Sequence, residues 1–131
     1  MTNANKRPRT YNTKGLAMEI YNWCKANDLW SDNTIYFKGK AWTNLEKWGG
    51  VKGKYIAEDL YEYDDKNPRD YFEYGNEPNI LAMSFEGPLN YVLNAYVDGW
   101  VELEQEFAAL FNRHGLYYEM GYAWSLSAYE N

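Results

Sequence analysis

The sequence predicts an α+β fold: a single domain with a mainly antiparallel sheet of about five or six strands and two or three helices packed on one face. Three observations predict it. Apolar residues recur at three- and four-residue steps near the N-terminus and again after Trp100. Short runs rich in β-favouring residues lie next to one another between turn signals. The regular alternation of strand and helix that builds a parallel sheet is absent.

The first half of the chain predicts one helix followed by strands. A helix is expected to begin after Thr13 as its N-cap and to end near Asn27, because its apolar residues share one face: Leu16, Ala17, Ile20, Trp23 and Cys24. Residues 34–44, TIYFKGKAWTN, predict a hairpin that turns at Lys38-Gly39. Residues 49–53 are expected to form a loop, and residues 54–63, KYIAEDLYEY, one strand.

The second half predicts a strand, two helices and a terminal hairpin. Asn67-Pro68 favours a short helical turn through Tyr71 and Phe72 that closes at Gly75. Residues 79–85, NILAMSF, predict a buried strand, and Gly87-Pro88 opens a helix that Gly99 ends or kinks. A second helical stripe then runs to Gly115, made of Trp100, Leu103, Phe107, Leu110 and Phe111. Residues 116–130 predict two short strands around Met120-Gly121.

Charge divides the chain into two parts. The first fourteen residues carry +4 without an acid, from Lys6, Arg7, Arg9 and Lys14, whereas residues 15–131 carry a net charge of −10. We expect residues 1–14 to form a flexible basic arm and residues 15–131 to form a single acidic α+β domain. The arm either contacts nucleic acid or remains a solvated tail, and we favour the tail.

The sequence gives little sign of catalysis, and we expect no enzyme activity, no cofactor and no metal site. The single histidine, His114, ends the last predicted helix, where an imidazolium complements the helix dipole. The single cysteine, Cys24, falls on an apolar helix face and can form no disulfide within the chain. Phosphate-loop, dinucleotide and zinc-protease motifs are absent. A small hydrolase that uses two of the many carboxylates is the third-ranked alternative.

One stretch combines carboxylates with phenols. Residues 58–77, EDLYEYDDKNPRDYFEYGNE, hold eight acids opposed by only Lys66 and Arg69. Tyrosines supply anchor area at interfaces, while carboxylates on a rigid surface can stand in for phosphates before a cationic receptor. If residues 54–63 form one strand, Glu58 and Glu62 lie roughly 13 Å apart on one face. Glu102, Glu104 and Glu106 of the later helix extend the acidic array, Glu102 and Glu106 lying one turn apart.

We therefore predict a partner-binding surface within residues 58–77. The candidate contact residues are Glu58, Asp59, Tyr61, Glu62, Tyr63, Asp64, Asp65, Asp70, Tyr71, Glu73, Tyr74 and Glu77.

The chain resembles small acidic anti-defence proteins of phages and mobile elements, of the anti-CRISPR and antirestriction type. The resemblance lies in its size, its acidity, its tyrosine and tryptophan content and its C-terminal half, NILAMSFEGPLNYVLNAY through HGLYYEMGYAWSLSAYE. It implies inhibition of a host nucleic-acid-binding protein or nuclease, for example a CRISPR effector, by a DNA-mimicking surface, and a location in the host cytoplasm.

The runner-up hypothesis is a non-enzymatic adaptor that binds an unrelated partner through an aromatic patch around Tyr71 and Phe72. Direct nucleic-acid binding by the folded body is disfavoured because its net negative charge repels phosphate. The sequence contains no apolar run long enough for a membrane span, and we expect a cytoplasmic protein. The oligomeric state stays open.

Overall fold

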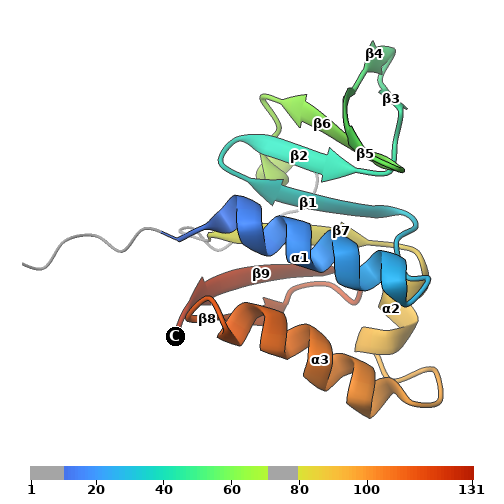
Figure 1. The fold of residues 1–131 in the computed structure, drawn as a ribbon, viewed down its shortest axis with the longest axis vertical. Helices are drawn as coiled ribbons and strands as arrows, with labels where there is room; N and C mark the ends of the chain where they lie inside the picture. The colour runs from blue at the N-terminus through green and yellow to red at the C-terminus, as the bar shows by residue number, and fades with distance from the viewer. Residues whose placement is uncertain (1–10, 71–79) are drawn as a thin grey trace, which may run out of the picture.

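The structure is a computed structural model that describes residues 11–70 and 80–131. Within these ranges, three α-helices cover one face of a seven-stranded antiparallel sheet, which confirms the predicted α+β class (Figure 1). The helices are α1 (Thr13–Ala26), α2 (Pro88–Leu93) and α3 (Trp100–Asn112). In spatial order the strands are β5 (Lys54–Ala57), β6 (Leu60–Asp64), β2 (Lys40–Thr43), β1 (Asn33–Phe37), β7 (Leu81–Phe85), β9 (Ser125–Glu130) and β8 (Leu116–Met120).

Helix α1 begins one residue earlier than predicted. Its N-cap is Asn12, whose Oδ1 accepts a hydrogen bond of 2.9 Å from the amide of Gly15 and so satisfies one of the free N–H groups of the first turn. Thr13 and Lys14, which the prediction placed in the arm, are therefore helical. The apolar face that the sequence indicated is buried, as its residues Leu16, Ala17, Ile20 and Cys24 show.

The strands between α1 and residue 70 differ from the prediction in two places. The β1–β2 hairpin turns at Lys38-Gly39 as expected, with positive φ at both residues. Residues 54–63, however, form two strands rather than one, because the chain reverses at Glu58-Asp59, where Asp59 has a φ of 57°. Tyr55 thus pairs with Tyr61 across the β5–β6 hairpin, and the expected 13 Å spacing of Glu58 and Glu62 along one strand is wrong.

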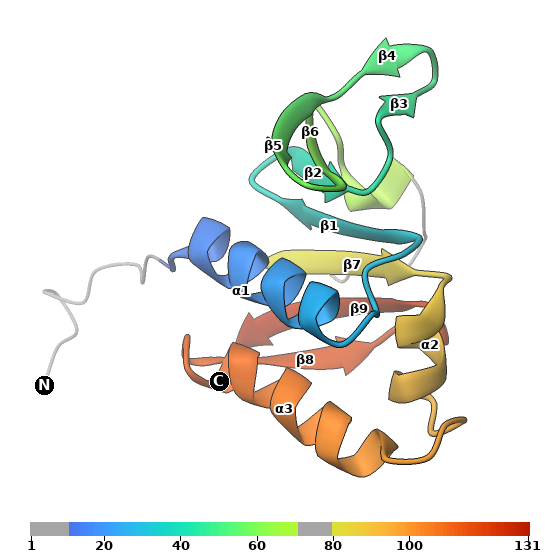
Figure 2. The same cartoon turned by 45° about the vertical axis from the view of Figure 1, so that its right-hand side comes forward.

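The predicted loop at residues 49–53 also contains structure. Strands β3 (Lys47–Trp48) and β4 (Val51–Lys52) form a separate two-stranded sheet around Gly49-Gly50. Both glycines have positive φ, at 57° and 81°, as a tight two-residue hairpin requires. This hairpin projects beyond the β5–β6 end of the main sheet (Figure 2), which has seven strands because residues 54–63 form two strands.

The C-terminal elements follow the prediction closely. Strand β7 is buried in the sheet between β1 and β9, and Pro88 occupies the start of α2. Gly99 separates α2 from α3 with a φ of 77°. Asn67-Pro68 opens a 3₁₀ turn, Pro68–Asp70, and its expected continuation through Tyr71 and Phe72 to Gly75 lies outside the described residues.

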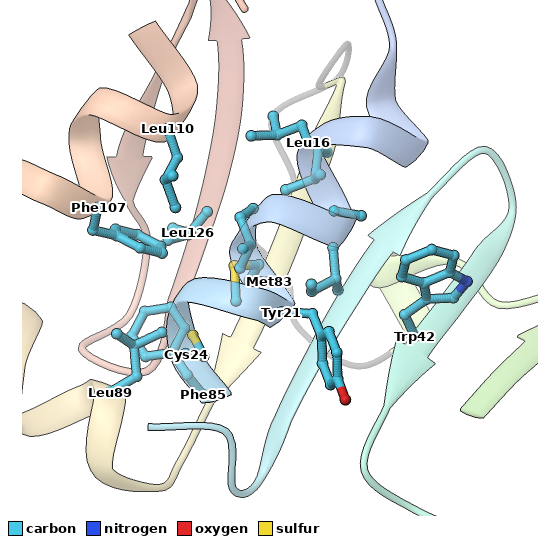
Figure 3. Close-up of a cluster of buried hydrophobic side chains, with 14 of the residues drawn as sticks. Leu16, Tyr21, Cys24, Trp42, Met83, Phe85, Leu89, Phe107, Leu110 and Leu126 are labelled. Carbon is cyan, nitrogen blue, oxygen red and sulfur yellow. The ribbon is translucent and has the colours of Figure 1, made fainter. Parts of the chain in front are cut away.

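Side chains alternate between two faces of the sheet. The main core lies under the helices, where Phe107 and Leu110 of α3 meet Met83 of β7 and Leu126 of β9 (Figure 3). The opposite face carries a smaller cluster of buried residues, made of Tyr36, Ala41, Tyr63 and Ala82. Trp48, Tyr61, Tyr122 and Trp124 pack against this second cluster. Across residues 11–70 and 80–131, every helix is too short or too polar to cross a bilayer.

Candidate functional site

The described members of the predicted contact set do not form one surface. Glu58 and Asp59 form the β5–β6 turn, whereas Asp64 and Asp65 lie at the far end of β6. Between these two ends of β6, Glu62 faces the helix side of the sheet, whereas Tyr61 and Tyr63 face the opposite side. Asp70 ends the 3₁₀ turn. The remaining predicted residues, Tyr71, Glu73, Tyr74 and Glu77, lie outside the described residues.

The β5–β6 turn is fastened to α1. Lys25 reaches the carboxylates of Glu58 at 2.9 Å and Asp59 at 3.4 Å. The backbone carbonyls of the same two residues accept hydrogen bonds from the Tyr21 hydroxyl and, at 2.7 Å, from the Trp30 indole. Both turn carboxylates therefore share a lysine of their own chain, and part of their role is to hold the sheet edge against α1.

Glu62 and Asp64 share a second lysine. The Lys40 ammonium lies 3.1 Å from Glu62 and 3.7 Å from Asp64. The indole N–H of Trp42 also donates to Glu62 at 2.9 Å. Burial on its own raises the pKa of Glu62, but the Trp42 and Lys40 hydrogen bonds outweigh burial and lower that pKa. Glu62 is thus an ionised group that its surroundings neutralise.

Tyr63 is a structural residue rather than an exposed anchor. It is only 4% exposed, and its hydroxyl donates a 2.7 Å hydrogen bond to the carbonyl of Leu45. Trp48 packs edge-on against its ring at 5.4 Å, which fixes the root of the β3–β4 hairpin. Tyr61, on the same face, is half-buried and meets the ring of Tyr55 at 6.0 Å. Of the two tyrosines, only Tyr61 retains surface for a partner.

A different set of carboxylates is held in place without a cation. Glu104 of α3 accepts a hydrogen bond of 2.6 Å from the Tyr118 hydroxyl, and Glu106 accepts one of 3.0 Å from the Trp23 indole. Burial, followed by the neighbouring Glu104, raises the pKa of Tyr118, so the phenol keeps its proton and remains a donor. Neutral donors fix the position of a carboxylate while leaving its charge intact.

We call Glu102, Glu104 and Glu106 the acidic helix surface. Glu102 is exposed in the first turn of α3 and lies one turn from Glu106. The helical sequence pattern already indicated these three residues, because 3.6-residue periodicity is visible locally. Their aromatic donors were missed, since Trp23 is 83 residues away from Glu106 and no sequence signal connects them.

Charges segregate along the long axis of the molecule. Residues 33–70 hold seven basic and seven acidic residues, whereas residues 80–131 hold seven acids and a single basic residue, Arg113. Arg113 is bound to Glu19 of α1 at 2.8 Å. Figure 1 places α3 and the β3–β4 hairpin at opposite ends of the molecule. The excess of negative charge among the described residues is therefore concentrated around α3 and β8.

The two residues with catalytic potential have structural surroundings. His114 follows α3, and its Nε2 contacts the Glu19 carboxylate that also binds Arg113. Cys24 is fully buried in the main core, and burial raises the pKa of its thiol to about 12. Within the described residues, no group of three or more metal-ligating side chains comes together.

Comparisons with known proteins gave no match, whether to family models, to curated proteins or to solved structures.

Proposed function

We propose that this protein is a non-enzymatic inhibitor of a basic nucleic-acid-binding protein, of the kind that anti-defence proteins block. It engages its target through the acidic helix surface. The observation that carries the proposal is the way two of these carboxylates are held: Tyr118 orders Glu104 and Trp23 orders Glu106, and neither donor carries a charge. The carboxylates are thus fixed before binding and remain available to a cationic partner.

The spacing of the acidic helix surface suits a receptor for polyphosphate. A helix rises about 1.5 Å per residue, so Glu102 and Glu106 lie about 6 Å apart along the axis on one flank, with Glu104 about midway between them on the other flank. One strand of DNA presents a phosphate about every 3.4 Å of axis. Glu106 lies on the flank of α3 that faces α1, and Glu104 lies on the flank that faces β8. A basic surface laid along the outer side of α3 therefore meets carboxylates at both of its edges.

The residue environments favour binding over chemistry. His114 shares the Glu19 carboxylate with Arg113, which gives its ring a structural contact, and the thiol of Cys24 is buried. The carboxylates predicted from the sequence in residues 58–64 are each paired with Lys25 or Lys40. Paired carboxylates have less to offer a cationic receptor than ones held by neutral donors. The acidic helix surface is therefore the stronger candidate for the contact.

Two triple variants with equal changes in net charge test the proposal. The helix variant combines Glu102→Gln, Glu104→Gln and Glu106→Gln, which removes three charges and keeps an oxygen acceptor at each position. The control variant combines Glu58→Gln, Asp59→Asn and Asp64→Asn, which removes three charges that have lysine partners. Each tagged protein is used to capture targets from nuclease-treated bacterial lysate, and captured proteins are identified and assayed for nucleic-acid binding.

The expected result is that wild type and the control variant capture a nucleic-acid-binding protein and inhibit its binding of DNA or RNA, while the helix variant does neither. Duplex DNA should also displace the captured target, and binding should weaken steeply with salt. If only the control variant fails to capture the target, the contact surface lies within residues 58–64 and not on the acidic helix surface. Capture that survives both variants would show an apolar adaptor instead, and would refute the electrostatic proposal.

A further inference from the structure

Exposed apolar side chains gather at the connection between α2 and α3 and on the helix ends that flank it. Five of the ten exposed large hydrophobic residues fall within eleven positions there. We call these five residues the aromatic loop; they are Tyr91 (54% exposed), Tyr96 (75%), Val97 (38%), Trp100 (37%) and Val101 (43%). Single exposed apolar residues are ordinary, but a contiguous group of them marks a binding surface. The aromatic loop leads directly into Glu102, the first residue of the acidic helix surface.

The aromatic loop is held in a defined conformation. The amide of Tyr96 donates to the carbonyl of Tyr91 at 2.8 Å, and their rings meet edge to face at 6.4 Å. The Asn94 side chain donates to the carbonyl of Ala123 at 2.7 Å, which ties the loop to the β8–β9 turn. Ala95 has a φ of 63°, a left-handed conformation that is unfavourable for alanine and persists only where surrounding contacts impose it.

Among the residues that the structure describes, the charged side chains beside the aromatic loop are carboxylates. Residues 95–102 line an open surface hollow of about 330 Å³ whose charged side chains are Asp98 and Glu102. No lysine or arginine occurs between residues 80 and 112. Both carboxylates are exposed, and neither has an ion-pair partner in the part of the chain that the structure describes. Phenol and indole rings beside unpaired carboxylates match the two binding modes of a guanidinium, which stacks on a ring and pairs with a carboxylate.

We infer that the aromatic loop is an arginine-binding subsite, which receives arginine side chains of the basic partner next to the acidic helix surface. The inference rests on the proposed function and deepens it by naming the anchor. Arginine fits better than lysine because its flat, weakly hydrated guanidinium can stack on Trp100 or Tyr96 while it donates two hydrogen bonds to Asp98 or Glu102. A lysine ammonium offers only a point charge.

Two fluorescein-labelled peptides of equal charge test the inference, one of repeated Arg-Gly and one of repeated Lys-Gly. Fluorescence anisotropy measures the affinity of each for the full chain. The aromatic variant combines Tyr96→Ala and Trp100→Leu, which leaves every charge in place. Tyr55→Ala, which removes another exposed tyrosine on β5, is the matched control. Circular dichroism and a thermal melt establish that each variant is folded.

The wild type and Tyr55→Ala are expected to bind the arginine peptide at least about fivefold more tightly than the lysine peptide. The aromatic variant should lose this preference and bind both peptides equally. Equal binding of the two peptides by wild type, or a preference that survives in the aromatic variant, overturns the inference. Analytical ultracentrifugation gives a third outcome that overturns the inference. If the wild type forms a dimer and the aromatic variant does not, a second copy of the chain covers the aromatic loop.

Failure of the proposed function gives a different pattern. The helix variant would then capture the same target from lysate as the wild type does. This outcome does not depend on how the wild type binds the arginine and lysine peptides. If the triple variant loses the target while the aromatic variant keeps both the target and its arginine preference, only the subsite assignment is wrong.

Discussion

The hydrogen bond between Tyr118 and Glu104 can be removed with little change in packing. Tyr118 on β8 lies between two rings of α3, with centroid distances of 5.3 Å to Phe107 and 5.2 Å to Phe111. The substitution Tyr118→Phe keeps this aromatic packing and deletes only the hydroxyl that donates to Glu104 at 2.6 Å. The variant therefore isolates the contact that orders one carboxylate of the acidic helix surface.

The structure sets the size of the expected effect. A hydrogen bond to a charged group contributes about 1.5–3 kcal/mol to stability. Glu104 is half-buried rather than fully buried, so water replaces part of the lost bond in the variant. We expect Tyr118→Phe to lower the free energy of unfolding by about 1–2 kcal/mol. For a chain of this length, that corresponds to a fall in melting temperature of about 3–8 °C.

Urea unfolding followed by tryptophan fluorescence and circular dichroism measures the difference. Tyr117→Phe is the control, because the Tyr117 hydroxyl bonds Glu119 at 3.2 Å on the exposed surface and its removal should leave the unfolding midpoint unchanged. A double-mutant cycle with Glu104→Ala should show coupling between the two sites. An unchanged midpoint for Tyr118→Phe, or effects of Tyr118→Phe and Glu104→Ala that simply add, would refute the reasoning.

Three further predictions concern the core, an ion pair and a close backbone approach. The thiol of Cys24, which is fully buried, should resist a thiol reagent at mildly alkaline pH until urea unfolds the chain; rapid labelling of the native protein would contradict its burial. Burial raises the pKa of Glu19, but Arg113 and His114 outweigh burial and lower it below its ordinary value of 4.5. Its folded pKa is therefore depressed, so its stabilising contribution is present above the unfolded pKa and is lost as pH falls through the folded pKa. Glu19→Gln should make the urea midpoint less sensitive to acid, and an unchanged pH profile would count against the ion pair. An alanine at Gly53 would place its Cβ 2.7 Å from a buried tyrosine ring, so Gly53→Ala should destabilise the chain by about 1–3 kcal/mol in urea unfolding; wild-type stability would show that the ring moves freely.

Local patterns were sufficient for most elements of the fold. Apolar periodicity located α1 and α3, and Gly87-Pro88 marked the start of α2, because these signals lie within a few residues of the structure they specify. The reversal at Asp59 was missed because this aspartate is the only turn-forming residue between two β-favouring runs, with no glycine, asparagine or proline beside it. The β3–β4 hairpin was missed although Gly49-Gly50 is a two-residue turn signal, since its strands have only two residues each.

The candidate site was less predictable than the fold. Composition located the carboxylates of residues 58–64, but their lysine partners come from elsewhere: Lys25 lies on α1 and Lys40 on β2. Tertiary contacts decide whether a lysine neutralises a given carboxylate. A single sequence does not show which residues make those contacts. Likewise, nothing in the run YEYDD distinguishes Tyr63, which is buried, from Tyr61, which is half-exposed.

Within residues 11–70 and 80–131, lysines near the β3–β4 hairpin and glutamates around α3 lie at opposite ends of the long axis, which gives this part of the molecule a permanent electric dipole moment. In the field of a polycation, such a dipole experiences a torque that turns α3 toward the cation before the two molecules touch. Ions screen this field over about 8 Å at physiological salt. The rotation is thus confined to the last nanometre of approach, where it raises the fraction of collisions that begin in a productive orientation.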